Sequence, residues 1–155
     1  TKEDLFAAVV EEVYAGLVAD MTAILTAKAP VAERIDRLYV RLGQASDAEI
    51  AVVRMVIREM LVSSPRRKRL LARFLAGHIP VGLTTLVDGI AAGALTDRHP
   101  PAVLGIATVC LGVFPQVMRR IMGDAVPPEL GIPGGEDLAH ALADVLVKGI
   151  GQRRK

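Results

Sequence analysis

The chain has 155 residues and a formal net charge of +2 at pH 7; 52% of its residues are hydrophobic, but only 3% are aromatic. This length predicts a single domain over residues 1–155 with a core of its own. The near-balanced charge and the few aromatic rings argue against tight nucleic-acid binding by this chain itself. Cys110 is the single cysteine, which excludes an internal disulfide, and the sequence carries no signal-peptide pattern, so we expect a cytoplasmic location.

The first predicted element is a helix over about residues 1–27. Thr1 can accept a hydrogen bond from a first-turn backbone N–H, and Asp4 takes the partner position of a capping box. The helix ends before Pro30, because the residue preceding a proline is pushed out of the helical region. Since a helix cap stands at residue 1, we expect the natural polypeptide to continue upstream; the alternative is simple trimming of a tail. The apolar residues at helical spacing are Leu5, Val9, Val13 and Leu17, with Phe6, Val10, Met21 and Ile24 beside them.

Two helices are predicted next, over residues 31–43 and 47–64. The first ends in a glycine, Gly43, which is typical of the residue just after a helix. The second follows Ser46, whose hydroxyl suits the N-cap position. Both present apolar residues on one side, as expected for helices that pack on a core.

A fourth helical stretch is predicted over residues 65–95. Its first residue is Pro65, which suits the first helical position after a Ser64 cap. The stretch contains Pro80, and a proline inside a helix removes a hydrogen bond and clashes with the preceding turn. We therefore expect a kink near His78 or a break into two pieces.

The C-terminal third predicts two more helices, over residues 102–122 and 136–151, joined by a Gly/Pro-rich loop. No segment shows the alternation of a strand, so the predicted class is all-α with about six helices. The uncharged run 101–118 has only the minimum length for a membrane span and contains Pro115 and Gln116. We therefore expect no membrane insertion.

These last two helices carry more apolar surface than one core requires. In the last helix, His140, Asp144 and Lys148 form a single narrow polar stripe, and the 102–122 helix has no charge before Arg119. The apolar arc of each helix exceeds the roughly 100° that one buried face needs. A second apolar side in a soluble protein is typical of an interface with another copy.

We therefore expect the 102–122 helix to face its own core on one side and a second copy, across a two-fold axis, on the other. The predicted core side consists of Val103, Ile106, Cys110, Val117 and Ile121. The predicted dimer side consists of Leu104, Ala107, Leu111, Met118 and Met122, together with Leu138, Leu142, Val145, Leu146 and Gly149 of the last helix. Two such pairs would form a four-helix interface; the alternative is that both are central helices of a monomer.

The opening segment TKEDLFAAVVEE, residues 1–12, resembles a junction in the TetR/AcrR family of bacterial transcriptional regulators, where a helix-turn-helix domain meets the regulatory domain. RMVIREMLVSSPRRKRLLARFL, VDGIAAGAL and EDLAHALADVLVKGI agree with the family in layout. The resemblance implies an orthogonal bundle of about six helices that senses a ligand and forms a homodimer, in a regulator expected to be a repressor. DNA binding would then belong to a domain outside this chain. The alternative is a stand-alone helical protein–protein interaction module.

In this family the effector binds in a mostly apolar cavity, so the resemblance implies a small apolar or amphipathic effector here, and no cofactor. One wall is expected on the fourth stretch, from Phe74, His78, Val81 and Thr85. The opposite walls are expected from Tyr14, Met21, Tyr39, Arg54, Met55 and Arg58. Leu5 and Phe6 would be covered by the DNA-binding domain.

Each candidate also has a plainer interpretation. His78 can be a core histidine bonded to a carbonyl, Arg54 can pair with an acid, Arg58 can be solvated and the methionines can fill gaps. The basic run 66–73 surrounds a helix start and fits a solvated end better than a phosphate site. The three histidines and the cysteine lack metal-ligand spacing, and no nucleophile or phosphate-loop motif occurs, so we expect neither a metal site nor an enzyme.

Overall fold

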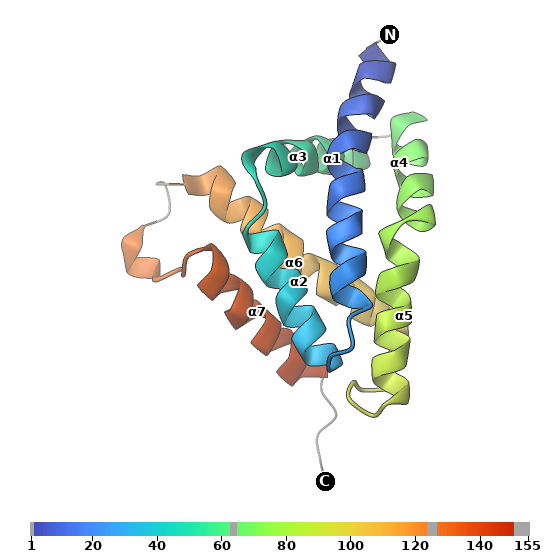
Figure 1. Ribbon diagram of the computed structural model, residues 1–155. Helices are drawn as coiled ribbons and strands as arrows, with labels where there is room; N and C mark the ends of the chain where they lie inside the picture. Colours follow the sequence, from blue (N-terminus) through green and yellow to red (C-terminus); the bar gives the residue numbers. More distant parts are fainter. Residues whose placement is uncertain (1, 63–64, 124–126, 151–155) are drawn as a thin grey trace.

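The computed structural model describes residues 2–62, 65–123 and 127–150, and every regular element in these ranges is helical (Figure 1). In chain order the elements are α1 (Lys2–Leu25), α2 (Val31–Gly43), α3 (Asp47–Leu61), α4 (Pro65–Ala76), α5 (His78–Ala91), α6 (Pro101–Met122), the 3-10 helix η2 (Pro128–Leu130) and α7 (Gly135–Ile150). The predicted all-α class is confirmed. The predicted caps Thr1 and Ser64 and the side chain of Phe6 lie outside the described residues.

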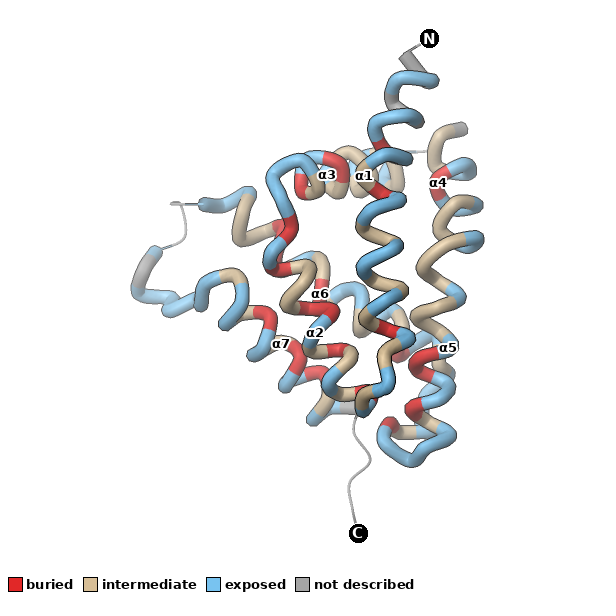
Figure 2. The backbone as a smooth tube through the Cα atoms, viewed as in Figure 1, coloured by how far each residue is buried: buried red, intermediate tan, exposed pale blue. Residues whose placement is uncertain are grey.

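The helices form two groups that share one core. α1 runs alongside α5, and α3 lies across α1 beside α4, with contacts to both (Figure 1). On the other side, α2 packs chiefly against α7, while α6 crosses behind α2 and contacts α5 and α7 as well. Figure 2 shows buried positions along the facing sides of α2 and α7, and further ones on α5 and α6.

Local signals explain the start of α3. The Ser46 hydroxyl accepts a hydrogen bond from the Glu49 N–H (3.2 Å), and the Glu49 carboxylate accepts one from the Ser46 N–H (2.7 Å). This reciprocal pair is a capping box and confirms the predicted helix start. Glu49 also pairs with Arg41 of α2 at 2.5 Å, so the cap joins two helices.

The fourth predicted stretch is two helices, with a bend of 44° between α4 and α5. The break lies at Gly77, whose φ of −115° and ψ of −111° are not helical. Pro80 is the third residue of α5, in the first turn, where backbone N–H groups have no intrahelical partner. Pro80 has no N–H for the carbonyl of Ala76, the last residue of α4, so the break lies in the turn before the proline, as predicted.

The end of α5 lies four residues before the predicted end at Leu95. Gly93 adopts the left-handed region with a φ of 68°, and the N–H groups of Ala94 and Leu95 donate to the Gly89 carbonyl at 2.9 and 3.0 Å. The chain therefore turns back, and Leu95 enters the core with 1% of its surface exposed. Leu95 packs on Gly89, where a Cβ atom would lie 2.8 Å from the leucine Cδ1.

The orientation of α6 about its axis differs from the predicted one. Leu104, assigned to a dimer side, is 2% exposed and belongs to the main core, whereas Val103 and Ile106, assigned to the core, are 48% and 65% exposed. Ile121 and Cys110 are exposed as well, and of the predicted core side only Val117 is buried.

The cause of this orientation is the contact between Tyr39 and α6. The Tyr39 hydroxyl donates to the Thr108 carbonyl at 2.7 Å. The same ring lies against Gly112, where a Cβ atom would be 2.7 Å from the tyrosine Cε1. A glycine thus decides which side of α6 faces inward, and because almost every residue of the helix is apolar, hydrophobic periodicity could not reveal it.

On α7 the predicted dimer residues divide between core and surface. Leu146 is buried together with Ala139 and Ala143, and Leu142 packs against the same core. Val145 and Gly149 are exposed, and Leu138 is half-buried. Similarly on α6, Ala107, Leu111 and Met118 are half-buried and Met122 is exposed.

α6 is also long and apolar enough to cross a membrane, and the bent pair α4–α5 passes the same test of length and composition when it is taken as one span. Such helices also occur in the cores of soluble proteins. The cytoplasmic location and the lack of membrane insertion stay predictions.

Candidate ligand cavity

A cavity of about 410 Å³ lies among α1, α2, α5 and α6. Met21 and Leu25 contribute the wall from α1, and Ile35 and Leu38 the wall from α2. The remaining wall comes from α5 and α6 and consists of His78, Ile79, Gly82, Leu83, Thr85, Leu86, Ala102, Gly105, Ile106, Thr108, Val109 and Cys110. The lining is therefore mainly aliphatic, with few groups able to form hydrogen bonds.

The two threonines of the cavity wall both donate hydrogen bonds from their hydroxyl groups to backbone carbonyls. Thr108 donates to the Leu104 carbonyl at 2.8 Å, and Thr85 donates to the Val81 carbonyl at 3.0 Å, with the Leu25 carbonyl 3.3 Å away. A hydroxyl that donates to the backbone retains acceptor capacity on its oxygen. Thr85 and Thr108 can therefore accept a hydrogen bond from a ligand but have no proton left to donate.

His78 supplies the donor. The Tyr14 hydroxyl lies 2.7 Å from His78 Nδ1, and in the tautomer in which Tyr14 donates this hydrogen bond the proton of the neutral imidazole is on Nε2. Burial lowers the pKa of His78 below its usual range, and the positive charge of Arg73 lowers it further. Burial likewise raises the pKa of the Tyr14 phenol. Both groups are thus neutral at pH 7, and the cavity wall carries one N–H donor without a net charge.

An aromatic cluster holds the imidazole in place. The Phe74 ring lies 5.4 Å from the Tyr14 ring and 5.1 Å from the His78 ring, centroid to centroid. Arg73 covers the Tyr14 ring at 4.7 Å and forms a bidentate pair with Glu11 of α1, with distances of 2.6 and 2.8 Å. This hydrogen-bonded pair holds the pKa of Glu11 below its usual range. α1 is thereby joined to α4 and to the start of α5 directly beside the cavity.

The structure brings only part of the predicted ligand site together. Met21, His78 and Thr85 line the cavity, and Tyr14 and Phe74 lie behind His78. Val81 packs against the adjoining core and accepts the Thr85 hydroxyl at its carbonyl.

Four other predicted ligand residues lie elsewhere. Tyr39 is 1% exposed in the core, because its ring packs on Gly112. Arg54 and Arg58 line a separate recess of about 400 Å³ between α3 and α6, and Met55 is half-buried on α3. For Arg54, Met55 and Arg58 the reason is that α3, which carries them, contributes no residue to the cavity lining.

Sequence reasoning missed the α6 wall and the glycines. A Cβ atom added at Gly82 would meet no atom within 4 Å, and one at Gly105 would meet only Leu83 and Leu86, at 3.6 and 3.7 Å. Small residues on two facing helices leave space between them, and this is the one signal in the sequence that could have indicated a cavity here. Thr108 and Cys110 gave no such signal.

Within the described residues, no group of three histidine, cysteine or acidic side chains is placed to hold a metal ion. The chain was also compared with protein-family models, with curated proteins and with solved structures, and none of them matches it.

Proposed function

We propose that this chain is the ligand-sensing and homodimerising domain of a transcriptional regulator of the TetR/AcrR type. The observation that carries the proposal is the cavity of about 410 Å³ with aliphatic walls from four helices and one neutral N–H donor at His78. Ligand sites commonly combine apolar walls with a few placed polar groups. The likeness of residues 1–12 to the family's interdomain junction supports the transcriptional part of the proposal.

The lining specifies the ligand class. An aliphatic molecule with a single hydrogen-bond acceptor, such as a ketone, ester or lactone, matches the His78 Nε2–H and the apolar remainder. A cation finds no carboxylate in the wall, and an acid finds no positive charge, since the pKa of His78 is lowered. The ligand we propose is therefore neutral.

The position of His78 suggests how binding is transmitted. It is the first residue of α5, directly after the break at Gly77, and Tyr14 ties it to α1. A ligand that displaces the His78 imidazole by hydrogen bonding to it would alter the bend between α4 and α5. A small cluster of Val10, Val52 and Leu70 couples α4 to α1 and α3, the end at which a DNA-binding domain would precede α1.

Dimerisation is proposed through the exposed apolar faces of α6 and α7. The α6 face consists of Val103, Phe114 and Ile121, together with Ile106 and Cys110, which are exposed and also line the ligand cavity. The α7 face consists of Ala141, Val145 and Gly149. An unpaired apolar surface of this kind is typical of an interface. The alternative of a stand-alone interaction module uses the same faces with a different partner.

The test of ligand binding uses 2-octanone, which has one acceptor, and n-octane, which has none. Methyl NMR of the methionines reports the site, because Met21 lines this cavity and Met55 and Met60 lie on α3. We expect 2-octanone to shift the Met21 signal and to raise the melting temperature. His78→Phe keeps an aromatic ring but removes the donor, so it should weaken 2-octanone binding about fivefold and leave n-octane binding unchanged. His140→Asn, on the exposed side of α7, is the matched control and should alter neither.

An unshifted Met21 signal with both probes would overturn the sensing role. The transcriptional role is tested separately, by reading the coding sequence upstream of Thr1. A helix-turn-helix encoded there supports the proposal, and an upstream sequence without one favours the interaction module.

A further inference from the structure

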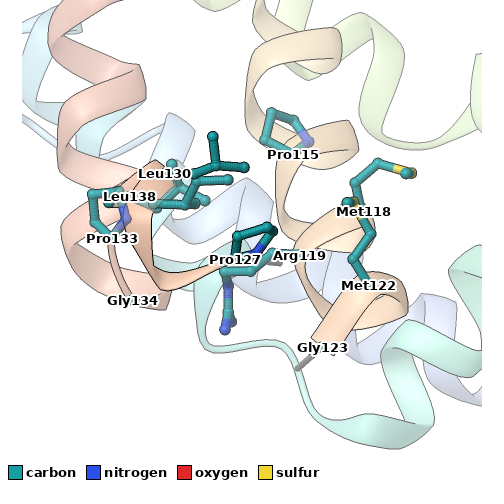
Figure 3. Close-up of a pocket in the computed structure, with 12 residues that line it drawn as sticks. Pro115, Met118, Arg119, Met122, Gly123, Pro127, Leu130, Pro133, Gly134 and Leu138 are labelled. Carbon is teal, nitrogen blue, oxygen red and sulfur yellow. The ribbon is translucent and has the colours of Figure 1, made fainter. Parts of the chain in front are cut away.

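A second cavity, of about 630 Å³, lies at the opposite end of α6 (Figure 3). Met118 and Met122 of α6 form one wall, and Leu130 and Leu138 form another across the space. Prolines at positions 115, 127 and 133 complete most of the apolar lining. This cavity shares no lining residue with the one that contains His78.

One charged side chain, Arg119, lines this cavity and lies between its two apolar walls (Figure 3). Its Nε atom is buried and has no hydrogen-bond partner among the described residues. The next residue, Arg120, differs in this respect, because it pairs with Asp47 at 3.2 Å and does not line the cavity. Arg119 as a whole is half-buried and lines the cavity, and a buried N–H without an acceptor favours an anion beside the guanidinium.

Arg119 lies in the last turn of α6, where that helix meets the start of α7. A Cβ atom on Gly135, the first residue of α7, would lie 3.1 Å from Arg119 Nη2, so the guanidinium sits against the start of that helix. A helix N-terminus carries partial positive charge and disfavours a cation unless an anion is present. Two acidic residues follow in the first turn, but Glu136 bonds to Gln44, and both Glu136 and Asp137 are exposed and absent from the cavity lining.

We propose that this second cavity binds an amphipathic carboxylate, with the carboxylate on the Arg119 guanidinium and the alkyl chain between the methionine and leucine walls. Arginine presents a planar fork of N–H donors that matches the two oxygens of a carboxylate. The apolar lining has room for a medium-length alkyl chain. The inference does not depend on the proposed sensing role, because it uses another cavity and an anionic ligand, whereas the ligand proposed for the first cavity is neutral.

The test uses octanoate below its micellar concentration, with 1-octanol as the uncharged control. Methionine methyl NMR separates the two cavities, because Met118 and Met122 report this one and Met21 reports the other. We expect octanoate to shift the Met118 and Met122 signals saturably and 1-octanol to shift them far less. Arg119→Gln should weaken octanoate binding by at least about tenfold, because it removes the charge-assisted hydrogen bonds.

Arg120→Gln is the matched control: it removes an equal charge one residue away and should leave octanoate binding within about twofold. Arg119→Lys keeps the positive charge but not the planar pair of N–H donors. Its affinity for octanoate should therefore lie between those of the wild type and Arg119→Gln. A melting curve shows that each variant is folded before binding is compared.

Three results would overturn the proposal. The first is that octanoate leaves the Met118 and Met122 signals unchanged, and the second is that Arg119→Gln binds octanoate as well as the wild type does. The third is that these signals shift with protein concentration alone and that octanoate does not compete, which would assign an acidic group of a second copy to Arg119. A shift of Met21 by 2-octanone in the same samples would leave the sensing role intact in every case.

Discussion

The Tyr14 hydroxyl lies 2.7 Å from His78 Nδ1, and this hydrogen bond joins the middle of α1 to the first residue of α5. The two residues are 64 positions apart in the chain, yet together they decide which ring nitrogen of His78 carries the proton. The polarity of the cavity wall therefore depends on a residue that does not line the cavity.

Tyr14→Phe should cost about 0.5–1.5 kcal/mol of unfolding free energy, because it removes one part-buried hydrogen bond. It should also weaken 2-octanone binding, since Nδ1 can then take the proton from Nε2. Urea unfolding measures the first effect, and the ¹⁵N chemical shifts of the His78 ring measure the second. Tyr39→Phe is the control, because it deletes the hydroxyl that donates to Thr108 and should destabilise the fold without changing the His78 tautomer. An unchanged tautomer in Tyr14→Phe would contradict the positioning role.

His78 and His140 should make the free energy of unfolding depend on pH in opposite directions. The pKa of His78 is lowered from 6.5 by burial, so its contribution is present above pH 6.5 and is lost as the pH falls through the folded-state pKa. The pKa of His140 is raised from 6.5 by its hydrogen bond to Asp36, so its contribution is present below pH 6.5 and is lost as the pH rises through the folded-state pKa.

Melting temperatures of His78→Asn and His140→Asn between pH 4 and pH 9 test these signs. Relative to the wild type, the first variant should lose less stability on acidification below pH 6.5. The second should lose less on passing from acid to neutral pH. Parallel curves for all three proteins would show that neither histidine is perturbed in the folded chain.

Gly82 and Gly112 form a matched pair of helical glycines. Gly82→Ala should stabilise the fold by about 0.5–1 kcal/mol, because alanine is the better helix former and the new methyl group enters open space. It should also narrow the cavity and weaken n-octane binding. Gly112→Ala should destabilise by about 1–3 kcal/mol, because the methyl group would lie 2.7 Å from Tyr39. Urea unfolding of both variants measures the difference, and equal effects would refute the packing described for α6.

Val145→Glu should weaken self-association without unfolding the chain, because Val145 is 60% exposed on α7. A charge placed in an apolar interface should raise the dimer dissociation constant by at least about tenfold. Val87→Glu, at an exposed position on α5, is the control and should leave the constant unchanged. Sedimentation equilibrium gives both values, and a wild-type chain that remains monomeric at all concentrations would remove the basis for the dimer.

Local signals made much of the fold predictable. The Ser46 capping box depends on residues close in sequence, and α2 ends and α3 begins at the predicted residues. Gly43 itself is the last residue of α2, and Gln44 takes the cap position that was predicted for the glycine. The break near His78 was also expected from Pro80, and it lies at Gly77, directly after Ala76, whose carbonyl would otherwise pair with residue 80. Each of these features is encoded within one or two turns of chain.

Contacts between distant residues could not be predicted in the same way. Which side of α6 faces inward depends on Tyr39 meeting Gly112, 73 positions later, and a uniformly apolar helix carries no pattern that shows it. For the same reason Leu104 and Leu146 were expected at a surface and lie in the core. Three ligand contacts could be proposed because they lie on apolar helix faces with few polar alternatives: His78, Thr85 and Met21. The hydrogen bond between His78 and Tyr14 could not be predicted.

The close approach at Gly77 links two properties that a sequence comparison would treat as separate. A Cβ atom there would lie 2.5 Å from the Tyr14 hydroxyl, so any side chain at position 77 displaces the group that holds the His78 tautomer. The helix break and the hydrogen-bonding character of the cavity therefore cannot change independently. Among related chains, we expect positions 77 and 14 to vary together: a larger residue at 77 should accompany a residue without a hydroxyl at 14, and with it a change in the class of ligand.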